Sequence, residues 1–179
     1  MAAFQMQQHV RFQHCDPAAI VFYPRYFEMI NLTVEEWFGT GLDWGFHRMH
    51  EVDDRGIPTV RISVDFSAPS RLGDVLDWSL AVQRIGSSSL DVEIVARCEG
   101  ELRLTCQSTL VQFVKSTGRP VAWSAGIREK MRAFEDSPMA NSTIILRGVN
   151  HSERIIQIAI NAEIDSAAAR RRGDEQRNR

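Results

Sequence analysis

The 179-residue sequence has few cysteines and no excess of either charge. Its three cysteines, Cys15, Cys98 and Cys106, include no Cys-x-x-Cys pair. That count and spacing argue against a disulfide framework or a zinc knuckle, so we expect reduced thiols in a cytoplasmic protein. The formal net charge is −2, which argues against a surface built for nucleic acid.

Long apolar runs are also lacking. All are far shorter than the roughly 18 residues that indicate a membrane-spanning helix, and the first residues do not resemble a secretory signal. Hydrophobic residues make up 44% of the chain and charged residues 25%, an ordinary globular composition. The sequence therefore predicts a soluble protein with one core, with or without an appendage.

An apolar helix is predicted near the start of the chain. Residues 5–13 carry β-branched and aromatic side chains and predict a first strand. Pro24 then opens a helix, because proline at the first helical position loses no intrahelical hydrogen bond. Residues 25–38 are apolar on most sides, so we expect this helix to be buried, for example inside a curved sheet, and to end at Gly39 and Gly41.

The pattern then changes from helical to strand periodicity. Four stretches alternate apolar and polar residues, namely 60–66, 76–82, 90–96 and 102–106. Turn-rich separators join them, so neighbouring strands are expected to be antiparallel. Val111 and Phe113 change parity and predict a bulge late in the last strand. One buried helix and about five strands give an α+β fold class.

The remaining segments are less regular. Residues 42–52 predict a short helix, and Ser124 is expected to cap a final core helix at 125–134. Residues 138–179 form an extension whose isoleucine spacing fits an amphipathic helix and also a strand. The basic run Arg170–Arg172 has acidic neighbours, so we assign it no role in binding nucleic acid or a membrane.

Candidate chemistry is densest just before the first helix. Asp16 precedes a proline in a loop that leads to a helix amino terminus, whose free N–H groups are suited to polarising a carbonyl oxygen. A carboxylate there can attack a thioester or activate water. On local chemistry alone, capping of a turn is the favoured alternative for Asp16.

Two other pairs of residues give weaker signals. His14 and Cys15 are adjacent and point apart in extended chain, so we do not expect a nucleophile pair. His47 and His50 lack a third ligand at a clear spacing, so we interpret them as surface or packing residues and expect no metal site.

Residues 11–26, which read RFQHCDPAAIVFYPRY, resemble the active-site signature of the 4-hydroxybenzoyl-CoA thioesterase family. The likeness extends more weakly to about residue 135. It implies a hot-dog fold over residues 1–137, in which an antiparallel sheet wraps a central helix and protomers pair into a homodimer or homotetramer. It also implies hydrolysis of an acyl-CoA without a cofactor. Asp16 would act as nucleophile or general base, and the backbone N–H of Tyr23 would hold the thioester carbonyl.

The resemblance also implies substrate-binding residues. Many relatives have glycine where Ala19 stands, and benzoyl enzymes of this type can have an acid at the position of Asn31. Asn31 fits either a hydrogen bond to a polar aryl group or a helix–sheet contact. Pocket-wall residues are expected at Thr59 and Ser63. The expected contacts to the CoA nucleotide are Arg84, Ser87, Ser88 and Ser89, for which a plain polar hairpin is the alternative.

Together these features predict an acyl-CoA thioesterase that prefers an aromatic acyl group. Phe22, Trp37 and Phe38 either help to line an aryl pocket or belong to the core. One alternative is a short-chain acyl-CoA or acyl-carrier-protein thioesterase of the same fold. Another is a non-catalytic module that binds acyl-CoA.

Overall fold

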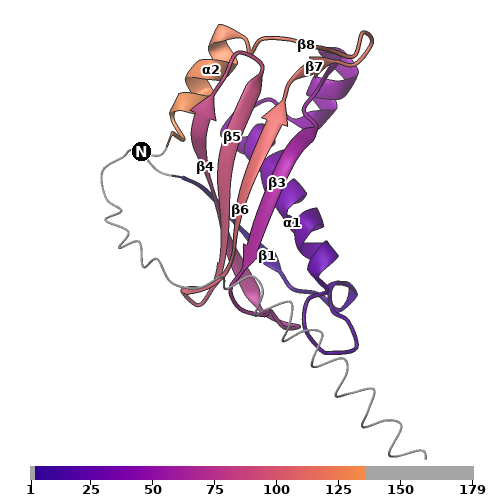
Figure 1. Cartoon of the computed structure of the whole chain (residues 1–179), viewed down its shortest axis with the longest axis vertical. Coiled ribbons are helices and arrows are strands. Elements are labelled where there is room, and N and C mark those ends of the chain that lie inside the picture. The colour runs from indigo at the N-terminus through magenta and orange to yellow at the C-terminus, as the bar shows by residue number, and fades with distance from the viewer. Residues whose placement is uncertain (1–2, 136–179) are drawn as a thin grey trace, which may run out of the picture. The chain divides into compact units, whose positions relative to one another are not determined.

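The computed structural model describes residues 3–135, so the extension predicted at 138–179 lies outside the described residues (Figure 1). One antiparallel sheet has the strand order β1-β4-β5-β6-β3. Its strands are β1 (Phe4–His9), β3 (Thr59–Phe66), β4 (Val75–Ile85), β5 (Ser89–Cys98) and β6 (Glu101–Val111). The helix α1 (Tyr23–Glu36) lies along one face of this sheet (Figure 1). The α+β hot-dog fold predicted from the sequence is confirmed.

The core lies between α1 and the sheet. On β4 as far as Val82, and on β5, the even-numbered residues point toward the helix and are almost fully buried, as strand periodicity requires. They are Leu76, Trp78, Leu80, Val82, Leu90, Val92, Ile94 and Ala96. The other face carries polar pairs, including a hydrogen bond of 2.6 Å from Gln107 Nε2 to Glu93 Oε2.

The bulge predicted near Val111 is wrong in its position. On β6 the register shift lies opposite Ala96 and Arg97, near the start of the strand. The inward-facing positions then stay in phase to the end of the strand, where Ser108 and Gln112 occupy them and are buried. Because polar residues stand at these two inward-facing positions, the alternation of apolar and polar residues in the sequence looked as if it changed phase near Val111.

The two edge strands also differ from their predictions. β1 ends at His9 instead of residue 13, because Phe12–His14 form a short 3-10 turn. On β3, Val60 and Ile62 were expected to point into the core but are 59% and 39% exposed. β3 packs against the core only through Val64 and Phe66, so residues 3–135 leave the first half of this edge uncovered.

The central helix is buried on one side only. Its buried residues are Tyr26, Met29, Ile30, Thr33 and Val34. Gln8 of β1 ties this side to the sheet, since its Nε2 donates to Met29 O at 2.9 Å and to Thr33 Oγ1 at 3.0 Å. The opposite side, including Phe27, is exposed, which corrects the expectation of a fully buried helix. Trp37–Gly41 continue the helix as a wider π-helical turn, close to the predicted end.

Residues 42–56 and 112–134 gather at one end of the sheet, and we call them the distal cluster (Figure 1). Its elements are a helical turn at Arg48–Val52, β2 (Arg55–Gly56), β7 (Phe113–Val114), β8 (Arg119–Pro120) and α2 (Ala125–Arg132). The predicted helix at 42–52 is thus confined to its second half. Ser124 caps α2 as predicted, because its Oγ accepts from the Ile127 N–H at 3.3 Å.

Candidate functional site

Residues 10–22 form a tight loop around Asp16, which we call the Asp16 loop. The Asp16 N–H donates to Ile20 O, and the Ala19 N–H donates to Asp16 O, both at 3.0 Å. The Ala18 N–H donates to Asp16 Oδ1 at 2.8 Å, so the turn-capping role of this side chain is confirmed. Its second carboxylate oxygen accepts no hydrogen bond from residues 3–135, which leaves that oxygen open for chemistry.

The loop leads directly into the positive end of α1. The Phe22 N–H donates to His14 O at 2.9 Å, which ties the loop to the helix start. Within the described part of the chain, the N–H of Tyr23 has no acceptor. The first turn of α1 contains no acidic residue that would neutralise the helix dipole. The structure therefore places Asp16 and the Tyr23 N–H at the same end of one helix.

Ala19 stands where many members of the family have glycine. Its φ is 62°, in the left-handed region that glycine adopts more readily. The loop thus keeps a backbone shape suited to glycine although alanine stands there.

A groove of about 350 Å³ opens beside the middle of α1, and we call it the helix groove. It brings together Asn31 and Thr59, both predicted as substrate-binding residues. Its apolar lining residues are Val34, Phe46, Ile57, Pro58, Leu110 and Phe113. Asn31 follows Tyr23 by eight residues, about 12 Å along the helix axis. Phe27 is exposed between them at helical spacing, so one side of α1 leads from the helix start to the groove.

Two further polar residues line the helix groove, and neither was predicted from the sequence to bind substrate. The ring of His50 packs edge-on against Phe46, with 5.3 Å between centroids, so its interpretation as a packing residue is right but incomplete. Lys115 Nζ donates to His50 O at 2.9 Å. These residues are 65 positions apart in the chain, and no local pattern signals that they meet.

The structure does not bring Ser63 to the groove. Ser63 pairs with Gln107 on β6, and both point to the sheet face away from α1. Thr59 lies on the groove side because a register shift separates it from Arg61. Within one chain, Thr59 therefore lines the helix groove and Ser63 does not.

The hairpin between β4 and β5 lies at the other end of the sheet. Arg84 is about 30 Å along β4 from Val75, which is next to the Asp16 loop. Arg84 Nε forms an ion pair of 2.7 Å with Asp91 Oδ2, and this hydrogen bond holds the pKa of the Asp91 carboxyl below its usual value. Arg84 and Asp16 of one chain therefore lie far apart.

The three serines of this hairpin hold the distal cluster through their backbone carbonyls. Ser87 O accepts from the Trp123 N–H at 2.9 Å, and Ser88 O accepts from the Gln112 N–H at 2.8 Å. Ser89 O accepts from Trp123 Nε1 at 3.0 Å. The hairpin thus has a structural role, as its alternative interpretation held, and its hydroxyl groups make no hydrogen bond with residues 3–135.

His14 and Cys15 do not form a nucleophile pair. The Arg11 N–H donates to His14 Nδ1 at 3.0 Å, whereas Cys15 Sγ is directed at Arg11 O at 3.8 Å. Partial burial lowers the pKa of His14, which favours the neutral ring that accepts this bond. The buried Cys106 thiol is inert, because burial raises its pKa to about 12.

Of the three residues with alternative roles, Trp37 and Phe38 belong to the core. Both are fully buried, and their rings pack edge-on with 5.0 Å between centroids. Phe22 is exposed next to the helix start.

Two kinds of feature do not occur among residues 3–135. None of the helices there has the length and apolar character needed to cross a membrane. In the same range, no three His, Cys, Asp or Glu side chains come together as a metal site would require.

Comparison with known proteins points to one family. The sequence profile of the thioesterase-like superfamily matches residues 10–131. No curated protein matches the sequence. Among solved structures, the 1,4-dihydroxy-2-naphthoyl-CoA thioesterase of Synechocystis is similar, with a TM-score of 0.68 and 18% identity over 75% of this chain and 99% of that chain.

Two further structures share the fold. A gentisyl-coenzyme A thioesterase has a TM-score of 0.64 and 20% identity, covering 72% of this chain and 99% of that chain. A hypothetical protein of Staphylococcus aureus in complex with CoA has a TM-score of 0.70 and 13% identity, covering 84% of this chain and 98% of that chain.

Proposed function

We propose that this chain, which belongs to the thioesterase-like superfamily and is a thioester hydrolase, converts an acyl-CoA and water into a carboxylic acid and free CoA. The observation that carries the proposal is the shared position of Asp16 and the Tyr23 N–H. One oxygen of Asp16 is fixed by the Ala18 N–H, and the other is open beside an uncapped helix terminus.

The proposed chemistry uses these two groups together. The thioester carbonyl oxygen accepts the Tyr23 N–H, and the helix dipole stabilises the negative charge that develops on it. Asp16 either takes a proton from the attacking water or attacks the carbonyl carbon itself. In the first route water adds to the carbonyl carbon, the C–S bond breaks, and the proton that Asp16 took passes to the CoA sulfur. In the second route the C–S bond breaks as an anhydride forms between Asp16 and the acyl group, and water then hydrolyses this anhydride, which releases the acid, restores Asp16 and supplies the thiol proton. Neither route changes an oxidation state, so neither requires a redox cofactor.

The helix groove is the proposed site of the acyl group. A path along α1 from Tyr23 past Phe27 ends at Asn31, in a groove whose walls are largely apolar. Such a groove suits an aromatic ring with a polar substituent, which Asn31 or Thr59 can hydrogen-bond. The two thioesterases of similar fold are named for hydroxylated aromatic acyl groups, which agrees with this preference.

A second copy of the chain is proposed to complete the site. Val60 and Ile62 are exposed on β3, an edge strand that pairs only with β6 among residues 3–135, and such an edge favours pairing with another strand. Antiparallel pairing of β3 with its own copy reverses the direction of the partner's strands. It thereby brings the partner's β4–β5 hairpin to the end that holds Asp16, where Arg84 and the serines become candidates for binding CoA.

Three free thiols agree with a reducing cytoplasm.

The test is a hydrolysis assay with detection of free thiol on benzoyl-, hydroxybenzoyl- and short aliphatic CoA thioesters. Asp16→Asn is expected to lose about 10²- to 10⁴-fold in kcat. Asparagine still accepts the Ala18 N–H, so the turn is retained. Asp77→Asn on the outer face of the sheet is the matched control and should keep full activity.

Four outcomes would change the assignment. Activity that survives Asp16→Asn removes this residue from the mechanism, and binding without turnover supports the non-catalytic module. A clear preference for aliphatic thioesters favours the short-chain alternative. An active enzyme that stays monomeric by light scattering contradicts the role of the second copy.

A further inference from the structure

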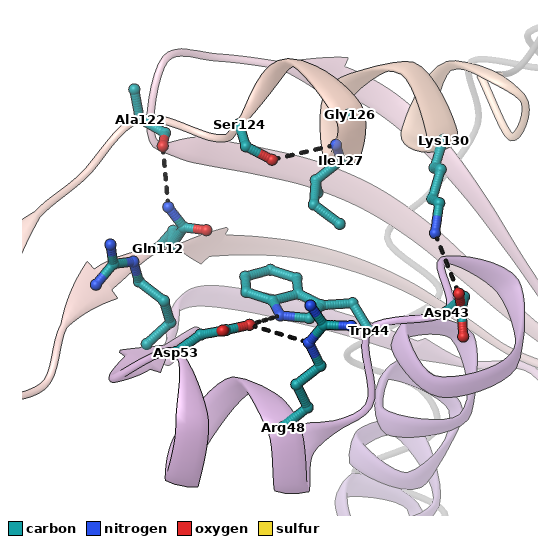
Figure 2. A pocket seen from close by; sticks show the side chains of 11 residues that line it. Asp43, Trp44, Arg48, Asp53, Gln112, Ala122, Ser124, Gly126, Ile127 and Lys130 are labelled. Carbon is teal, nitrogen blue, oxygen red and sulfur yellow. Dashed lines mark hydrogen bonds and ion pairs between the residues drawn. The ribbon is translucent and has the colours of Figure 1, made fainter.

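A cavity of about 460 Å³ lies within the distal cluster, separate from the helix groove, and we call it the distal cavity (Figure 2). It is formed by residues of the 42–55 segment, by Gln112 just after β6, and by the start of α2. Its volume is within the range of sites that bind small organic molecules. None of its residues lines the helix groove or belongs to the Asp16 loop.

The charged lining residues leave two guanidinium groups with unused donors. Asp53 is already committed, because it accepts from Trp44 Nε1 at 2.7 Å and lies 3.5 Å from Arg48 Nε. Lys130 donates to a backbone carbonyl and lies 3.6 Å from Asp43. Arg55 contacts only the Asp54 carbonyl, at 3.3 Å, and has no carboxylate partner among residues 3–135. The cavity therefore favours an anion.

The start of α2 presents a further anion-binding group. Ser124 uses its side chain on the Ile127 N–H, and the Arg128 N–H donates to Ser124 O. The Gly126 N–H has no acceptor in the described chain, and beyond its chain neighbours and the adjoining backbone of α2 no heavy atom lies within 4 Å of where a β-carbon on Gly126 would stand. This amide is therefore open to a ligand at the positive end of the helix.

A second polar group, on the buried residue Gln112, is aimed into the cavity. Gln112 is only 3% exposed, and its Nε2 donates to the carbonyls of Val121 and Ala122, both at 3.1 Å. These two bonds fix the amide so that its oxygen points into the cavity above the indole of Trp44 (Figure 2). That oxygen meets no donor among the described residues, so it can accept a hydrogen bond from a ligand that carries a donor as well as an anionic group.

The walls favour a flat ring between these polar groups. The indole of Trp44 lies on one side of the cavity, and the side chain of Ile127 lies on the other (Figure 2). Aromatic ligands stack on such surfaces. We propose that the distal cavity is a second site for a hydroxyaryl carboxylate. Arg48, Arg55 and the Gly126 N–H supply the positive potential that attracts its carboxylate, and its hydroxyl donates to Gln112.

A ligand of this class is the free acid that the proposed reaction releases, so its identity as the product rests on the proposed function. Binding itself does not, and it is measured without turnover. The probes are 3- and 4-hydroxybenzoate added to the ¹⁵N-labelled full-length chain. Benzoate lacks the hydroxyl and phenol lacks the carboxylate. The readouts are the NMR signals of the Gly126 amide and the Trp44 indole N–H.

At least one hydroxybenzoate is expected to shift both signals saturably, with benzoate about three- to tenfold weaker and phenol at least about tenfold weaker. Arg55→Met should weaken binding by about tenfold or more, because a charged hydrogen bond is lost. Arg71→Met, which removes an exposed arginine outside the cavity, should bind as the unmodified chain does. The wild-type comparison of ligands does not depend on the folding of any variant.

Either of two results would overturn the proposal. The first is an unmoved Gly126 amide with shifts confined to Asn31 and Thr59, since the acid would then occupy the helix groove alone. The second is equal affinity for phenol and the hydroxybenzoates, since the cavity would then not select a carboxylate. If hydroxybenzoate binds but no acyl-CoA is hydrolysed, the proposed function fails and the site remains.

Discussion

The Asp16 loop and the distal cluster lie at opposite ends of one sheet and are held in different ways. In the loop, Asp16 bonds to Ile20 and Ala18, and Phe22 bonds to His14, all within eight residues. In the distal cluster, Lys130 reaches Leu42 across 88 positions. Short-range bonds shape the interior of the loop, and only its ends are anchored to a distant segment, by the Val10 N–H to Asp74 O and the Val21 N–H to Ser70 O. The distal cluster, by contrast, exists only once distant segments have met.

The largest expected effect is a loss of stability when a buried ring that packs against the distal cluster is removed. Phe38 is fully buried, and its ring packs near those of Trp37, Trp44, Phe46 and Trp123. Phe38→Ala is expected to lower the free energy of unfolding by about 3–5 kcal/mol, measured by urea denaturation.

The matched change in the loop is Phe12→Ala, because Phe12 is 82% exposed. This variant should cost less than about 0.5 kcal/mol. Similar losses for the two phenylalanines would break the contrast between the two ends of the molecule.

A smaller effect should depend on pH and arise in the loop. Partial burial holds the pKa of His14 below its ordinary value of 6.5, so the unfolded chain binds this proton more readily than the folded chain. Stability due to His14 is therefore present above that ordinary value and is lost as the pH falls toward the lower folded value. In the structure His14 Nδ1 accepts a hydrogen bond from the Arg11 N–H. Protonation places a hydrogen on Nδ1 and therefore removes this bond.

His14→Asn sharpens this test, since asparagine offers an acceptor to the same N–H but does not titrate. The difference in unfolding free energy between wild type and variant should shrink as the pH is lowered through this range. A difference in unfolding free energy that stays constant with pH would mean that titration of His14 does not affect the stability of the protein.

The smallest expected effect concerns the loop backbone. Ala19 adopts a φ of 62°, which disfavours any residue with a β-carbon. Ala19→Gly should relieve this cost but also increase the entropy of the unfolded chain, so a gain of less than about 1 kcal/mol is expected. Thermal unfolding measures the change, and a clear loss of stability would show that the alanine methyl group contributes packing that the backbone angle does not reveal.

The sequence by itself determined those features that depend on neighbours along the chain. Pro24 marks the start of α1, Ser124 caps α2, and alternation placed Leu76 and Ile94 on the buried face. Asp16 was expected to cap a turn and does so. Each of these outcomes follows from capping, turn chemistry or strand periodicity, which act over a few residues.

Only the tertiary structure decided which residues at distant positions meet. It buried Trp37 and Phe38, left Val60 exposed on an edge strand, and turned Ser63 away from the helix groove. It also aimed the Gln112 oxygen into a cavity between segments about sixty residues apart in the chain (Figure 2). Periodicity shows that a residue faces the core side of its strand, but the exposure and partners of that residue depend on what the rest of the chain places over it.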